Sequence, residues 1–286
     1  MREIGVGNGC KGVSVTVGDS LAPSPSADRE PVLSIRGVSK RFGAIQALTD
    51  IDLDIFAGEV VAIVGDNGAG KSTLVKILSG VYAPDSGVIT CGGQHVSLSS
   101  PSASQALGIA TVFQDLALCD NLDLVLNLFL GRELGGFTVN EEEMERRAWE
   151  ILRRLSAKIP SVRVPVASLS GGQRQTVAIA RSLIGEPRVV ILDEPTAALG
   201  VAQAAEVLNL IETLREREHG VVLISHNMAD VQAVADRVVV LRLGRNNGHY
   251  NVPDVSYEEI IAAITGATDN VVTRRARGRN DSKVDL

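Results

Sequence analysis

The sequence predicts an α/β fold with a parallel-sheet core, an antiparallel β subdomain laid against it and a helical insertion. Three unbroken apolar runs, residues 60–64, 189–192 and 221–224, are typical of central parallel strands buried on both faces. Residues 50–55 instead alternate aspartate with isoleucine or leucine, which indicates an antiparallel strand with one buried and one solvated face. No strand pattern interrupts residues 116–155, and this stretch predicts the insertion.

Composition divides the chain into a leader, one folded domain and a tail. Residues 1–30 are rich in glycine, serine and proline, so they cannot bury enough apolar surface to order themselves, and we expect a flexible leader. The folded domain is expected over residues 31–265, with a helical subdomain at about 115–170. Within it, residues 141–155 carry apolar side chains at Met144, Ala148, Ile151 and Leu155, the spacing of an amphipathic helix. The polar, arginine-rich tail, 266–286, is expected to be disordered.

The amino-acid composition indicates which kinds of partner the protein can bind and in which cellular compartment it lies. Of the 286 residues 45% are hydrophobic and only 3% aromatic, and the net charge is -6, which argues against nucleic acid as a partner. The cysteines, Cys10, Cys91 and Cys119, lack metal-site or disulfide-framework spacing, and this favours a reducing compartment. There is no apolar stretch of the roughly 18 to 20 residues that cross a bilayer, and no secretory signal. We therefore expect a cytoplasmic protein that reaches a membrane only through an embedded partner.

The most specific motif is a glycine-rich loop between an apolar strand and a helix. Gly65, Gly68 and Gly70 allow successive backbone N–H groups to converge on phosphate oxygens. Lys71 can reach the β- and γ-phosphates, and the Ser72 hydroxyl can bind Mg²⁺. A helix over 72–78 would add its positive end to the same anion. The motif predicts a site for a nucleoside triphosphate and Mg²⁺, built from Gly65, Asn67, Gly68, Gly70, Lys71, Ser72 and Thr73.

Two carboxylates stand at the C-terminal end of the apolar run 189–192. Ligands in open α/β sheets bind beyond such strand ends. Asp193 is therefore expected to hold Mg²⁺, directly or through water. Its neighbour Glu194 is expected to polarise an attacking water, a role that typically contributes about 10²- to 10⁴-fold in rate.

A second anion site is predicted where Ser170, Gly171, Gly172 and Gln173 begin a helical run. A serine cap followed by glycines exposes helix N–H groups to an anion by the same physics as the first site. One nucleotide rarely needs both sites of a single subunit. The simplest explanation is that two copies pair head to tail and each closes the nucleotide site of the other.

Five motifs occur in the order and spacing of an ABC transporter ATPase: 65–73, Gln114, 169–173, 189–194 and His226. The resemblance covers about residues 32–250. It implies the ABC ATPase fold, with a P-loop NTPase (RecA-like) core, and ATP hydrolysis with Mg²⁺. Gln114 resembles the glutamine that senses Mg²⁺ and the attacking water, and His226 resembles the histidine that contacts the γ-phosphate. Phe42 lies where the family usually stacks an aromatic ring on adenine, and 170–173 resemble the signature that grips the partner's ATP.

One position departs from the family pattern. The family most often has aspartate where this chain has Gly200, and that aspartate helps to couple the two ATP sites, so tight coupling is not implied here. The run 196–201, with 106–115 and 127–133, resembles the ATPases of bacterial monosaccharide importers of the ribose, xylose and fructose type. A single module then implies a homodimer.

The resemblance also implies the partners. They are a second copy of the chain, a transmembrane permease and an external sugar-binding protein that acts through the permease. The chain itself is then expected to lie peripherally at the cytoplasmic face of the inner membrane. The alternative is a soluble or regulatory ABC ATPase that takes no part in transport. DNA-repair types need hundreds of coiled-coil residues between the phosphate loop and the signature, whereas Lys71 and Ser170 are only about a hundred residues apart. Translation types usually carry two ATPase modules and basic linkers, which this chain lacks.

Overall fold

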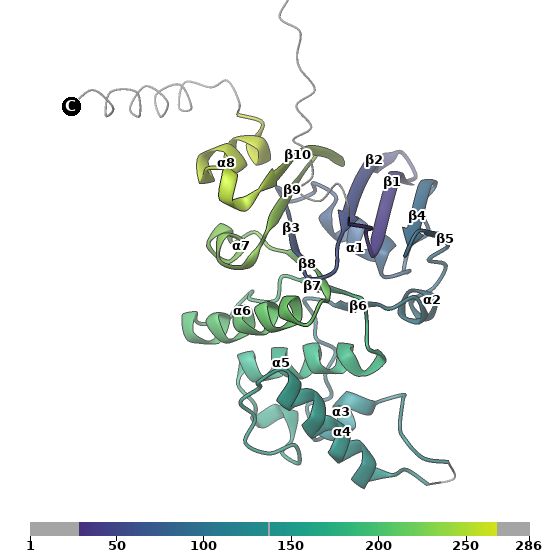
Figure 1. Ribbon diagram of the computed structural model, residues 1–286, viewed down its shortest axis with the longest axis vertical. Coiled ribbons are helices and arrows are strands. Elements are labelled where there is room, and N and C mark those ends of the chain that lie inside the picture. Colours follow the sequence, from purple (N-terminus) through teal and green to yellow (C-terminus); the bar gives the residue numbers. More distant parts are fainter. Residues whose placement is uncertain (1–28, 137, 268–286) are drawn as a thin grey trace, which may run out of the picture.

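The computed structural model describes residues 29–136 and 138–267, which fold into two sheets with helices packed around them (Figure 1). Residues 1–28, 137 and 268–286 lie outside the described residues, and with them nearly all of the expected leader and tail. Among the residues that are described, no helix has the length and apolar character needed to span a membrane.

The strands form one antiparallel and one largely parallel sheet. The four-stranded antiparallel sheet has the order β2-β1-β4-β5 and the six-stranded sheet the order β10-β9-β3-β8-β7-β6. The first sheet comprises β1 (Leu33–Phe42), β2 (Ile45–Ile55), β4 (Ser86–Cys91) and β5 (Gln94–Val96). The second comprises β3 (Val60–Val64), β6 (Ile109–Val112), β7 (Val189–Asp193), β8 (Gly220–Ile224), β9 (Arg237–Arg242) and β10 (Arg245–Asn251).

The buried apolar runs are the centre of the six-stranded sheet. Strand β3 pairs in parallel with β8 on one side and β9 on the other, and β7 lies parallel to both β8 and β6. Every residue of β3 and β8 is buried, because helices or the second sheet cover both faces. Only the edge strand β10 runs antiparallel. The predicted parallel core with a separate antiparallel sheet is thus confirmed.

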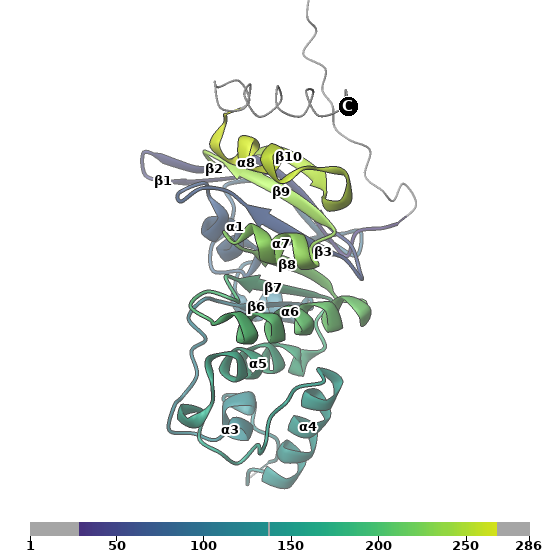
Figure 2. The same cartoon turned by 90° about the vertical axis from the view of Figure 1, so that its left-hand side faces the viewer.

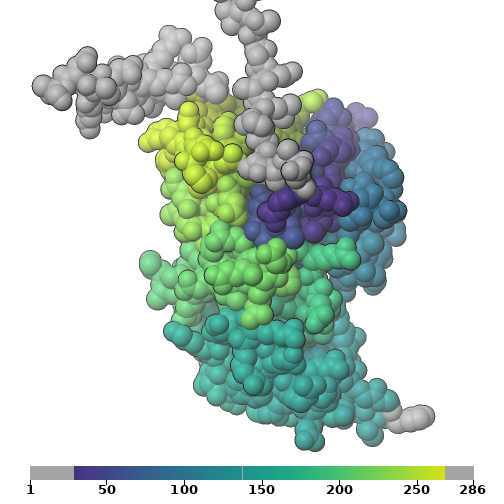
Figure 3. Space-filling view, viewed as in Figure 1, coloured from purple at the N-terminus to yellow at the C-terminus, as the bar shows by residue number. Residues whose placement is uncertain are grey.

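Eight α-helices surround the sheets within the described ranges. Both views place α5 between α6, which lies nearer the sheet, and a lobe formed by α3 and α4 (Figures 1 and 2). This lobe forms one end of the molecule (Figure 3). The helices are α1 (Lys71–Leu78), α2 (Pro101–Ala106), α3 (Leu124–Phe129), α4 (Glu141–Arg154), α5 (Gly171–Ser182), α6 (Val201–Glu216), α7 (Met228–Val234) and α8 (Tyr257–Thr265).

Helix α4 shows why the insertion is helical. Asn140 caps its first turn, since the side chain accepts a hydrogen bond from the Glu143 N–H at 3.0 Å. Three glutamates in the first turn and two arginines in the last complement the helix dipole. Met144 and Ala148 are buried as the spacing predicts. Leu155 is buried as predicted too, whereas Ile151 is only half-buried and Leu152, which the prediction left out, is buried in its place.

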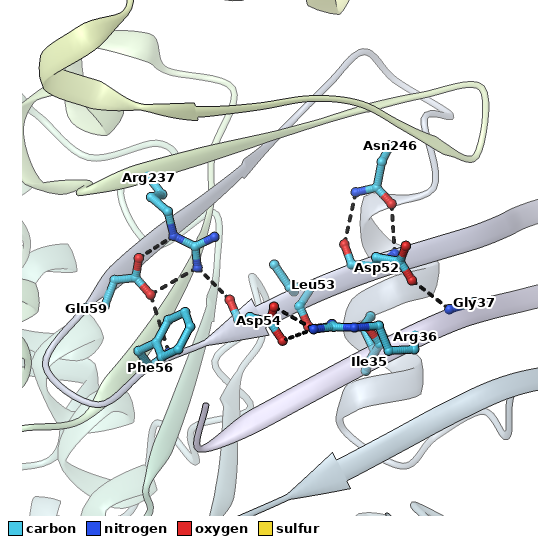
Figure 4. Close-up of polar contacts among 10 residues, drawn as sticks. All are labelled: Ile35, Arg36, Gly37, Asp52, Leu53, Asp54, Phe56, Glu59, Arg237 and Asn246. Carbon is cyan, nitrogen blue, oxygen red and sulfur yellow. Dashed lines mark hydrogen bonds and ion pairs between the residues drawn. The ribbon is translucent and has the colours of Figure 1, made fainter. Parts of the chain in front are cut away.

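Polar contacts join the antiparallel sheet to the parallel core (Figure 4). The Arg237 guanidinium on β9 makes a buried ion pair with Glu59 and donates to the Asp54 carbonyl of β2 at 2.6 Å. On β10, Asn246 accepts from the Asp52 N–H at 2.9 Å and donates to the Asp52 carbonyl at 3.2 Å. These bonds fix β2 against β9 and β10. The first residues of β2 are thereby held beside the glycine-rich loop.

Candidate nucleotide-binding and hydrolysis site

The glycine-rich loop between β3 and α1 packs against its neighbours too closely for side chains at two positions. A Cβ on Gly65, where φ is +155°, would lie 2.2 Å from the Leu241 carbonyl oxygen. A Cβ on Gly70, where φ is +106°, would lie 2.6 Å from the Leu48 side chain. Only glycine fits both this space and these dihedral angles. The backbone of the loop can therefore curve around an anion.

The glycine-rich loop carries positive charge, from Lys71 and from the N-terminus of α1, that no nearby acidic side chain of α1 neutralises. Gly70 is the N-cap of α1 and offers no side chain to the first-turn N–H groups, and no acidic residue lies in that turn. The Lys71 ammonium donates to the carbonyl oxygens of Gly65, at 2.7 Å, and Asp66, at 3.1 Å. Within the described chain it forms no ion pair. A helix N-terminus beside a free ammonium is the arrangement that binds phosphate groups.

A cavity of about 350 Å³ opens over this loop. The fold brings Gln114, which follows β6, and Asp193 and Glu194, at the end of β7, to the same cavity. The contribution of β2, from Ile45, Gln46 and Ala47, has no counterpart in the sequence prediction, because the alternating pattern of a strand indicates burial and not proximity to a ligand. The lining residues are Ile45, Gln46, Ala47, Asn67, Gly68, Ala69, Gly70, Lys71, Ser72, Thr73, Gln114, Asp193, Glu194 and Ile224.

The Asp193 carboxyl group lies in surroundings that disfavour its negative charge. Burial and the neighbouring Glu194 charge raise the pKa of its carboxyl group, against the opposing effect of Lys71 and Lys76. A carboxylate destabilised by burial gains most from a bound cation. The Ser72 hydroxyl and the Gln114 amide share the cavity with it, and Mg²⁺ prefers such oxygen ligands. The residue types at this place, Asp193, Ser72 and Gln114, are those that could hold Mg²⁺, and their role as its ligands stays a prediction.

Glu194 and His226 meet directly, although they follow different strands. The Oε2 atom of Glu194 lies 2.7 Å from Nδ1 of His226. The Glu194 side chain is 15% exposed, whereas that of His226 is 72% exposed. Glu194 has a φ of +52°, and its N–H donates to the Ile224 carbonyl at the end of β8, at 3.0 Å. A left-handed conformation is strained for a residue with a side chain, which is common at catalytic sites.

Residues 170–173 cap a helix and do not line this cavity. The Ser170 hydroxyl accepts from the Gln173 N–H, at 3.2 Å, and the Gln173 side-chain oxygen accepts from the Ser170 N–H, at 3.0 Å. Gly171 and Gly172 pack closely, because added Cβ atoms would lie 2.8 Å from Leu199 and 3.2 Å from Gln203. Close packing against the segment after Glu194 is thus one reason for these glycines. Within one chain the two predicted anion sites are separate.

Phe42 lies at the end of β1 and is 40% exposed, with its ring centroid 5.1 Å from that of Tyr82 in an edge-on arrangement. It pairs with Ile45 across the hairpin that leads to the cavity, but it is not among the lining residues. Its proposed stacking on adenine stays a prediction.

Comparison with known proteins identifies the class to which this fold and site belong. A family model described as ABC transporter matches residues 48–197, just over half of the chain. The chain belongs to the ABC transporter family and is an ATPase of that family.

Among its relatives are two proteins of similar length. The chain is 43% identical over 235 residues to the xylose/arabinose import ATP-binding protein XylG of Sulfolobus acidocaldarius, covering 82% of this chain and 94% of that protein. It is 43% identical over 250 residues to the fructose import ATP-binding protein FrcA of Rhizobium meliloti, with 84% and 96% covered. A ribose import ATP-binding protein of Rubrobacter xylanophilus is 44% identical over 226 residues, and the chain spans 43% of its length.

Solved structures support the same fold. The cassette cbiO1 from Clostridium perfringens, part of an ABC transporter complex, superposes with a TM-score of 0.70 at 29% identity, covering 84% of this chain and 96% of that one. The dimeric post-hydrolysis structure of the ATP-binding cassette MJ0796 with ADP and phosphate gives a TM-score of 0.65 at 27% identity, with 77% and 98% covered.

Proposed function

We propose that two copies of this chain bind and hydrolyse ATP at a shared interface and thereby power sugar uptake through a membrane permease. The proposal takes residues 31–265 as one ATPase domain with a helical subdomain at about 115–170. The observation that carries it is the convergence of Lys71, Asp193 and Glu194 on one cavity, while Ser170 caps a helix outside it. In a chain whose proposed phosphate-binding groups lie in two separate places, an ATP site is complete only when a second copy supplies the Ser170 group.

The chemistry follows from the placement of the side chains. The loop backbone and Lys71 bind and orient the triphosphate, and bound Mg²⁺ would neutralise charge on its phosphate oxygens. Glu194 accepts a hydrogen bond from the attacking water and orients it toward the γ-phosphate. His226 does not itself line the cavity, but it contacts Glu194, and from there it contacts the γ-phosphate. Ser170, Gly171, Gly172 and Gln173 of the second copy cover the nucleotide, while Phe42 stacks on adenine.

Transport follows from closure and reopening of this dimer. ATP closes the two copies, hydrolysis reopens them, and residues 115–135 transmit the motion to a loop of the permease. The relatives named for sugar import support sugar as the cargo class, with an external sugar-binding protein that delivers it to the permease. The ATPase would then lie peripherally at the cytoplasmic face of the inner membrane. Nucleic acid is not among the partners that we propose.

The test is sedimentation of a Glu194→Gln variant with and without Mg-ATP. This change keeps the shape of the side chain but removes its charge, so ATP should bind and not turn over. We expect a shift from monomer to dimer only with nucleotide, and a loss of hydrolysis of about 10²-fold or more. Unchanged turnover would remove Glu194 as the catalytic carboxylate. A monomer at saturating Mg-ATP would show that the chain does not close by itself.

A further inference from the structure

Two segments carry the side chains proposed for hydrolysis, and they touch at two places. Glu194 begins the segment that follows β7, and His226 begins the one that leads from β8 into α7. The first contact is the one between these two side chains at the cavity. The second lies further along both segments, where the Thr196 hydroxyl donates to Asp230 Oδ2 at 2.6 Å. Neither Thr196 nor Asp230 lines the cavity.

Asp230 is an unusual residue to find at this place. It is only 7% exposed, and no lysine, arginine or histidine of the described chain lies within ion-pair distance of it. Burying a carboxylate without a cation costs free energy unless hydrogen bonds compensate it. Its position in the first turn of α7 gives partial compensation from the helix dipole. The short bond from Thr196 is the specific contact that a buried apolar residue could not make.

The segment that Thr196 belongs to needs an external support. Glu194 and Ala198 both have left-handed backbone angles, with φ of +52° and +60°. Such conformations in residues with side chains persist only where the surroundings hold them. The Glu194 N–H bond to the Ile224 carbonyl ties the start of the segment to β8, but the bonds further along it, from Ala197 to Glu194 and from Leu199 to Thr196, are local turns. They cannot by themselves fix the segment against its neighbour.

The segment that carries Asp230 is anchored by its own hydrogen bonds and by the burial of α7. The Ser225 hydroxyl accepts from the Asn227 N–H at 3.0 Å, and the Asn227 side chain caps α7 by accepting from the Ala229 N–H at 3.1 Å. Val231 and Val234 on α7 are buried in the main core. Asp230 therefore lies on a helix that is fixed in the core. Its hydrogen bond with Thr196 restrains the strained segment that begins at Glu194.

We propose that Thr196 and Asp230 are positioning residues for ATP hydrolysis, which hold Glu194 and His226 in the mutual geometry that the chemical step needs. The inference rests on the function proposed above for those two residues. A small displacement of a catalytic group costs far more in rate than in binding of a nucleotide held mainly by the phosphate loop. The pair should therefore govern kcat and leave ATP affinity almost unchanged.

The test compares Thr196→Val, which removes the hydroxyl at constant volume, with Thr196→Ser, which keeps it. We expect Thr196→Val to lower kcat by about 10-fold or more, with KM and the affinity for a fluorescent ATP analogue within about twofold of wild type. Thr196→Ser should restore most of the rate. The matched control is Thr213→Val, because the Thr213 hydroxyl donates only to the Asn209 carbonyl within α6, and this variant should behave as wild type.

A second pair of variants covers the case in which Thr196→Val does not fold. Asp230→Asn keeps an oxygen acceptor for the Thr196 hydroxyl, whereas Asp230→Leu removes it at similar volume. We expect Asp230→Asn to retain most of the hydrolysis rate and Asp230→Leu to lose it, each rate corrected for the folded fraction from thermal unfolding. Wild-type kcat in Thr196→Val, or equal rates in the two Asp230 variants, would overturn the inference. Undiminished hydrolysis by Glu194→Gln would instead remove the catalytic role of Glu194 on which this inference rests.

Discussion

At the scale of single residues, the buried Arg237–Glu59 ion pair is expected to contribute strongly to stability. The two side chains are only 10% and 11% exposed, and the Arg237 guanidinium also donates to the Asp54 carbonyl across the junction of the two sheets (Figure 4). It lies 5.6 Å from the centroid of the Phe56 ring as well. Breaking a buried pair from one side leaves an uncompensated charge, which is costlier than replacing both partners.

We expect Glu59→Ala to lower the free energy of unfolding by about 3 to 5 kcal/mol, because Arg237 would remain buried without its carboxylate. The measurement is urea denaturation followed by circular dichroism. A matched surface control is Arg146→Ala on α4, since the Arg146 side chain is 62% exposed and its ion pairs are solvated. A loss for Glu59→Ala no larger than that of the control would mean that water reaches the junction and replaces the lost contact.

At the scale of elements, β10 brings a titratable group between the two sheets. Burial, followed by the positive charge of Arg237, lowers the pKa of His249, although Asp52 and Asp54 act in the opposite direction. The folded protein therefore holds His249 neutral at a pH where the unfolded chain takes up a proton. The stability linked to this group is complete above about pH 6.5 and is lost as the pH falls through that value toward the lowered folded-state pKa.

Replacement of His249 by glutamine, which stays neutral, should reduce the loss of thermal stability between pH 7.5 and pH 5.5. The readout is the melting temperature of wild type and variant at both pH values. His95→Gln is the control, because His95 on β5 is exposed and its replacement should leave the acid sensitivity as it is. Equal acid sensitivity of the His249→Gln variant and wild type would show that other groups dominate this pH range.

The elements that the sequence predicts best are those with a strong local pattern. Strands β3, β7 and β8 are continuous apolar runs with nearly every residue buried, and the glycine loop must join a strand to a helix. No local sequence pattern marks a contact between segments that are far apart along the chain. The place of β2 at the cavity and the bond between Thr196 and Asp230 arise only when the sheet order brings separate segments together. Sequence patterns indicate burial and local turns. Which strand ends lie side by side depends on the order of the strands in the sheet.

At the scale of the whole molecule, the separation of the two segments proposed to bind phosphate decides whether one copy of the chain can complete an ATP site. The glycine loop opens on one cavity, whereas Ser170 is exposed at the start of α5 and outside it. Gly171 and Gly172 pack against Leu199 and Gln203, so α5 also touches the segment that leads from Glu194 to α6. That segment contains Gly200 where the family most often has aspartate. The arrangement predicts that each ATP is completed by a second copy, and Gly200 leaves the strength of coupling between the two sites open.

Mixing two inactive variants tests this arrangement directly. Ser170→Arg disrupts the signature at residues 170–173, and Lys71→Ala removes the lysine of the phosphate loop. Each homodimer therefore contains two defective ATP sites. In a mixed dimer, the intact Lys71 of one copy faces the intact Ser170 of the other, and one complete site forms. We expect the ATPase activity of the mixture to exceed the sum of its two components.

The control mixture pairs Lys71→Ala with the double variant Lys71→Ala/Ser170→Arg, which cannot form a complete site in any combination and should stay inactive. The gain in the first mixture should rise with protein concentration, because it depends on association of two different copies. Activity that no mixture restores, from variants that are folded and associate with Mg-ATP, would mean that Ser170 acts on the ATP of its own chain. In that case the separation of the two elements seen here would have to close within one copy, by movement of α5 toward the glycine loop.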